Sequence, residues 1–87
     1  MWVSLGPEIV SRLGEYLFGY VSLPQFEDWF HRAVLDLDLS DHPVEADLVW
    51  AIKLRLAEVS NGDMNEGELR DSLREIEQKY MEAKAYS

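Results

Sequence analysis

Residues 45–60, with the sequence EADLVWAIKLRLAEVS, are the most apolar run of the chain and indicate a helix with two apolar faces. At about 100° per residue, one stripe collects Leu48, Val49, Ile52, Leu56 and Val59. A second stripe collects Ala46, Trp50, Leu54 and Ala57. Because a single neighbouring helix cannot cover both stripes, we expect this helix to be packed on two sides.

Length and composition indicate one small domain. The chain has 87 residues, which predicts a single helical domain over residues 1–87, and it contains no cysteine. The absence of cysteine excludes disulfides and thiolate metal sites and favours a cytoplasmic location. No signal-peptide pattern opens the sequence, and no apolar run approaches the roughly 18 residues of a membrane span, so we expect a soluble protein without membrane contact.

The net charge limits the possible partners. Seventeen acidic residues stand against eight basic ones, for a formal net charge of −9. A domain this acidic is repelled by phosphate backbones, so direct nucleic-acid binding is not expected. The charge can serve solubility, or it can recognise a basic partner such as the active cleft of a nuclease, where acidic side chains could take the place of phosphate.

Helix signals at Gly6, Pro7 and Glu8 predict an N-cap, a proline at the first position and a dipole-favourable acid. We expect Gly19 to lie just past the end of this first helix and Gly62 to end the central helix.

Two capping boxes introduce the second and fourth helices. Ser22 with Gln25, and Asn65 with Glu68, have the spacing of an N-cap residue and its partner three residues later. The expected buried faces that follow are Phe26, Phe30, Ala33 or Val34, and Leu37 in the second helix, and Leu69, Leu73, Ile76 and Tyr80 in the fourth.

Four helices with short connections predict an all-α fold, an antiparallel four-helix bundle built from two helical hairpins. The alternative is a degenerate, metal-free EF-hand-like pair, since the helix number and pairing suit it. Counting back from Gly19 places Gly14, Tyr16 and Phe18 at the first three calcium-ligand positions, and these residues cannot cage calcium.

No residue pattern indicates catalysis or metal binding. The two histidines, His31 and His42, do not have the spacing of a metal-binding pair. Carboxylates are abundant, but in a small bundle we expect them to be surface charge rather than a general acid and base. The sequence therefore predicts a non-enzymatic protein without cofactor or metal.

Two acidic clusters are candidate partner-binding surfaces. The first is rich in acids and has no lysine or arginine. Part of it lies toward a helix C-terminus, where the helix dipole opposes negative charge, so helix stability does not explain these acids. We rank it as the preferred docking surface; its members are Asp36, Asp38, Asp41, Glu45 and Asp47. The second, which the dipole of the fourth helix can explain, contains Glu58, Asp63, Glu66 and Asp71.

Trp50 and Leu54, on the second stripe of the central helix, are the apolar interface candidates. Tryptophan is frequent at interface hot spots, so this stripe predicts a homodimer or the docking of a partner helix. The alternative is that the aromatic residues border the seams of the bundle.

The stretch LGEYLFGYVSLPQFEDWF, residues 13–30, resembles the opening hairpin of bacterial immunity proteins of the colicin D type. The shared pattern has an apolar residue, Ser or Thr, then an acid followed by Phe, here Val21, Ser22, Gln25 and Phe26, with Gln25 in place of the usual acid. The resemblance implies a cytoplasmic four-helix bundle that blocks the basic active cleft of a cognate nuclease toxin with acidic side chains. The alternative function is a helical adaptor or self-associating module that docks through an apolar helix face.

Overall fold

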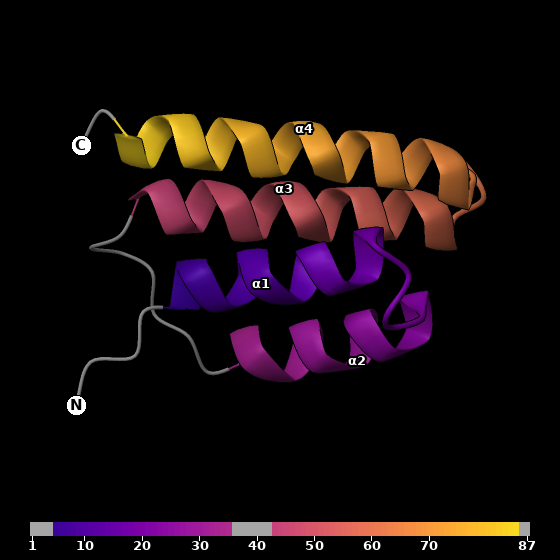
Figure 1. Ribbon diagram of the computed structural model, residues 1–87. Coiled ribbons are helices and arrows are strands. Elements are labelled where there is room, and N and C mark those ends of the chain that lie inside the picture. Colours follow the sequence, from indigo (N-terminus) through magenta and orange to yellow (C-terminus); the bar gives the residue numbers. More distant parts are fainter. Residues whose placement is uncertain (1–4, 36–42, 86–87) are drawn as a thin grey trace. The chain divides into compact units, whose positions relative to one another are not determined.

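The computed structural model describes residues 5–35 and 43–85. In these residues the secondary structure is four helices without a strand: α1 (Leu5–Leu17), α2 (Leu23–Val34), α3 (Pro43–Ser60) and α4 (Glu66–Ala85). α1 packs with α2 and α3 packs with α4, each pair running antiparallel (Figure 1). The two hairpins belong to two compact units. The predicted all-α class built from two helical hairpins is confirmed; the single-domain organisation stays a prediction.

α1 begins two residues earlier than the sequence predicts. Its first residue is Leu5, so Gly6 and Pro7 lie within the first turn instead of at the cap and the first position. The N–H groups of a first turn have no intrahelical acceptor, and a proline there therefore removes no hydrogen bond.

The predicted glycine stops are confirmed, and both have the same geometry. Gly19 follows α1 with a φ of 86°, Tyr20 N donates to Glu15 O at 2.8 Å, and Gly19 N donates to Tyr16 O at 3.0 Å. This pair of bonds is a Schellman motif, and it recurs after α3 around Gly62, whose φ is 82°. A left-handed residue other than glycine costs about 1–2 kcal/mol, which explains glycine at both positions.

The short connections are inconsistent with the EF-hand-like alternative. Gly14 and Tyr16, which would begin the first calcium loop, lie inside α1. Only residues 18–22 separate α1 from α2, and only residues 61–65 separate α3 from α4. An EF-hand loop needs 12 residues between its helices.

Both predicted capping boxes are present. Gln25 N donates to Ser22 Oγ at 3.3 Å, and Ser22 N donates to Gln25 Oε1 at 2.8 Å. In the second box Glu68 N donates to Asn65 Oδ1 at 2.8 Å, and Asn65 N donates to Glu68 Oε1 at 3.1 Å. The boxes satisfy N–H groups that a helix start leaves without intrahelical acceptors.

Removing either cap is expected to destabilise the protein moderately. Ser22→Ala and Asn65→Ala should each lower the free energy of unfolding by about 0.5–2 kcal/mol, measured by urea denaturation. Ser22→Gly and Asn65→Gly are the matched controls, since glycine at an N-cap costs only a few tenths of a kcal/mol. Unchanged stability of both alanine variants would contradict a capping role for the side chains.

Aromatic rings form the core of the first hairpin. Tyr16, Phe26 and Phe30 are buried, with ring centroids 5.8 Å apart for Tyr16 and Phe26 and 5.9 Å apart for Phe26 and Phe30. Trp29 borders this cluster at 6.4 Å from Phe26, and the Arg12 guanidinium lies 5.5 Å from the Trp29 ring centroid. The predicted burial of Phe26 and Phe30 is confirmed.

The two stripes of α3 have different environments. The first stripe is buried through Leu48, Val49, Ile52 and Leu56. On the second stripe, Trp50 is 67% exposed and Leu54 is 44% exposed. Within the hairpin of α3 and α4 the second stripe is therefore left exposed at Trp50 and Leu54, and packing on both stripes stays a prediction.

Candidate functional site

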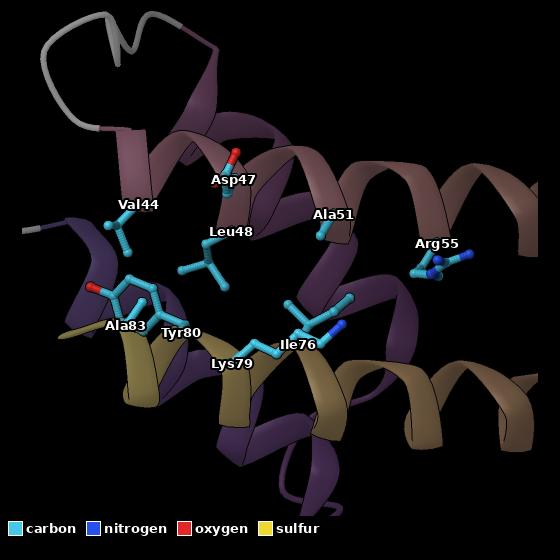
Figure 2. Close-up of a pocket in the computed structure, with 9 residues that line it drawn as sticks. All are labelled: Val44, Asp47, Leu48, Ala51, Arg55, Ile76, Lys79, Tyr80 and Ala83. Carbon is cyan, nitrogen blue, oxygen red and sulfur yellow. The ribbon is translucent and has the colours of Figure 1, made fainter. Parts of the chain in front are cut away.

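α3 and α4 enclose a groove of about 310 Å³, at the lower end of the size range of ligand pockets. All nine lining residues belong to this hairpin (Figure 2). Most are apolar: Val44, Leu48, Ala51, Ile76, Tyr80 and Ala83. The charged lining residues are Asp47, Arg55 and Lys79.

The groove follows from helical spacing and from small side chains. Leu48, Ala51 and Arg55 recur at intervals of three and four on α3, and so lie on one side of that helix. On α4, Ile76 and Ala83 are seven residues apart and face the same space (Figure 2). The alanines leave the volume open. Ile76, predicted as a core residue, is therefore only half-buried.

The charges that lie outside ion pairs on the two walls of the groove are opposite in the described residues. Asp47 on α3 and Lys79 on α4 are both exposed, and within the described part of the chain neither forms an ion pair. Arg55 differs from them because it pairs with Glu58 on its own helix. Asp47 and Lys79 are therefore the charged side chains of the groove that remain available to a ligand.

Glu45 connects α3 to α4 near one end of the hairpin. Its Oε2 accepts a hydrogen bond from Tyr80 Oη at 3.0 Å and lies 2.9 Å from Lys84 Nζ. Burial alone would raise the pKa of Glu45, but the hydrogen bonds from Lys84 and Tyr80 outweigh it, and the pKa is lowered. Burial and the Glu45 carboxylate raise the pKa of Tyr80 to about 12.

The described members of the first acidic cluster have different environments. Asp36, Asp38 and Asp41 lie outside the described residues. Glu45 is half-buried and engaged with α4, whereas Asp47 is exposed at the groove. Glu45 thus has a structural role that the sequence did not indicate, and its predicted role in partner binding stays a prediction.

Arginines accompany most of the second acidic cluster. Glu58 pairs with Arg55, Glu66 with Arg70 at 3.2 Å, and Asp71 with Arg74 at 3.6 Å, while Asp63 is exposed in the turn. Each pair joins residues three or four apart on one helix, where such pairs stabilise by a few tenths of a kcal/mol. Neutralisation by neighbours makes this cluster the weaker candidate for a basic partner.

Asp47, Trp50 and Leu54 lie at positions i, i+3 and i+7 of α3 and therefore share one face, which we call the outer face of α3. This face joins a member of the first acidic cluster to both apolar interface candidates. Trp50 and Leu54 are exposed on it, and Asp47 borders the groove. The outer face and the groove thus form adjoining parts of one candidate binding surface.

In residues 5–35 and 43–85, no helix has the length and apolar character needed to cross a membrane. Comparison with protein-family models, curated proteins and solved structures finds no match for this chain.

Proposed function

We propose that this chain is a small, acidic, non-enzymatic binding protein that docks on a basic protein through α3. The observation that carries the proposal is the outer face of α3, where the exposed Trp50 and Leu54 share a surface with Asp47. Interface hot spots are enriched in tryptophan, and acidic side chains around such a residue would steer a basic partner into contact. The net charge of −9 adds long-range attraction toward such a partner.

The most concrete form of this proposal is neutralisation of a nuclease toxin. Residues 13–30 resemble colicin D-type immunity proteins, and the excess of acids suits a cleft that normally holds nucleic acid. Carboxylates in such a cleft would replace phosphates and exclude the substrate.

The test is capture of partners from lysate of the source cell on immobilised protein at low and at moderate salt. We expect one basic protein, bound stoichiometrically at low salt and lost as salt rises. Its affinity should fall when Asp36, Asp38 and Asp41 are replaced together by Asn. A triple variant with Glu8→Gln, Glu75→Gln and Glu82→Gln changes the net charge equally and should bind more tightly than the Asn variant. Equal affinities of the two triple variants would reject the first acidic cluster as the docking surface.

A second candidate function, a helical adaptor or self-associating module, is favoured by the 67% exposure of Trp50. In that case the contact is apolar, so salt should not weaken it. Trp50→Ala should then cost about 2 kcal/mol or more of binding free energy, as expected for a hot spot. Sedimentation of the purified chain would distinguish self-association from capture of a different protein.

A further inference from the structure

We propose that the groove between α3 and α4 holds an amphipathic helix of the partner, with a basic flank beside Asp47 and an acidic flank beside Lys79. This inference rests on the proposed function and specifies the element of the partner that makes contact. It commits to a helix on another protein, not to a second copy of this chain.

The dimensions and lining of the groove suit a short helix. Its α3 wall runs from Val44 to Arg55, a length of about 16 Å at 1.5 Å per residue, which corresponds to about three turns of a bound helix. Apolar residues of a bound helix at i, i+3 or i+4, and i+7 would lie over Leu48, Ile76 and the ring of Tyr80. Small side chains in the groove wall would let the bound backbone approach closely.

The two wall charges select the flanks of the bound helix. Asp47 and Lys79 have opposite signs, lie on different helices and form no ion pair within residues 5–35 and 43–85. A helix with lysines on both flanks would place a like charge beside Lys79, and one with glutamates on both flanks would place a like charge beside Asp47. A helix with one basic and one acidic flank avoids both contacts, so charge complementarity favours it.

The test uses three synthetic peptides of about 15 residues that share one leucine face. One carries lysine on one flank and glutamate on the other, the second lysine on both, and the third glutamate on both. Affinities are measured by calorimetry at about 0.15 M salt, where long-range attraction is screened. We expect the unmodified protein to bind the mixed-flank peptide at least tenfold more tightly than the other two.

Charge reversal in the groove should change this preference predictably. Lys79→Glu makes both walls negative and should favour the two-lysine peptide, whereas Asp47→Lys makes both walls positive and should favour the two-glutamate peptide. Lys53→Glu, an exposed position of α3 outside the groove lining, changes the net charge as Lys79→Glu does and should keep the preference for the mixed-flank peptide. Equal changes of preference in Lys79→Glu and Lys53→Glu would overturn the proposal.

Filling the groove gives an independent result. Ala51→Leu should abolish peptide binding, and Ala57→Leu, at an exposed position outside the groove, should not, with circular dichroism confirming that both variants fold. Undiminished peptide binding by Ala51→Leu overturns the proposal. The proposal is also overturned if the chain forms a dimer that Ala51→Leu dissociates, because the groove would then hold a second copy of the chain. A salt-sensitive basic partner that still binds the Ala51→Leu variant would refute docking in the groove but not the proposed function. Preserved peptide preferences without any basic partner would refute only the proposed function.

Discussion

Replacing Phe30 with alanine is expected to lower the free energy of unfolding by about 3–5 kcal/mol. The Phe30 side chain has no exposed surface, and its ring centroid lies 5.9 Å from that of Phe26. Truncation would leave a cavity in the aromatic core of the first hairpin and remove a ring–ring contact. Domains of this size are stable by only about 5–15 kcal/mol, so the loss should be visible as a large shift of the urea midpoint.

Phe18→Ala is the matched control for Phe30→Ala. The same side chain is removed from the same hairpin, but Phe18 is 82% exposed beside the α1–α2 turn. Its loss should change stability by no more than about 0.5 kcal/mol. Similar midpoints for the two variants would contradict the aromatic core and would indicate that the first hairpin is held together elsewhere.

Features that depend on neighbours in the sequence were predictable. Each capping box joins residues three apart, and each stop depends on a glycine, so Ser22, Asn65, Gly19 and Gly62 show their roles without reference to tertiary structure. Burial of Phe26 followed from helical periodicity for the same reason. The arginine partners of the second acidic cluster could also have been found, because Arg70 follows Glu66 by one helical turn.

Features that depend on how two helices meet were not predictable. The acidic neighbours of Glu45 in the sequence predict a role in docking. Its hydrogen-bond partner Tyr80, however, lies 35 residues away on another helix, and the sequence does not indicate this contact. The groove depends likewise on small side chains contributed by both helices, while in the sequence Ala51 and Ala83 look like ordinary helix formers. Periodicity gives the face of a residue, but it does not give the register between helices.

Replacing Tyr80 with alanine is expected to cost about 3–5 kcal/mol in the free energy of unfolding, because the ring is 7% exposed and its hydroxyl bonds the Glu45 carboxylate. Tyr80→Phe retains the ring and should cost about 1.5–3 kcal/mol, the contribution of a hydrogen bond to a charged group. A Tyr80→Phe variant as unstable as Tyr80→Ala would show that the ring contributes little. Chemical denaturation of both variants near neutral pH separates the two contributions.

The same contact predicts how stability changes with pH. The pKa of Glu45 is lower in the folded protein, so its stabilisation is present above its ordinary value of 4.5 and is lost as the pH falls through the lower folded pKa. Burial raises the pKa of Glu77, so protonation of Glu77 stabilises the folded protein as the pH falls, opposite to the effect of Glu45.

At alkaline pH the stabilisation from Tyr80 is complete below its ordinary pKa of 10.0 and is lost as the pH rises toward about 12. Denaturation curves should therefore be collected across pH. As the pH falls, Glu45→Gln should lose less unfolding free energy than the unmodified protein, because it lacks the Glu45 contribution. As the pH rises, Tyr80→Phe should lose less, because it lacks the Tyr80 contribution. Because Glu77 is unchanged in Glu45→Gln, subtracting the variant curve from that of the unmodified protein isolates the Glu45 contribution. A difference curve that stays flat from neutral to acid pH would mean that the Glu45 carboxylate does not hold α3 to α4.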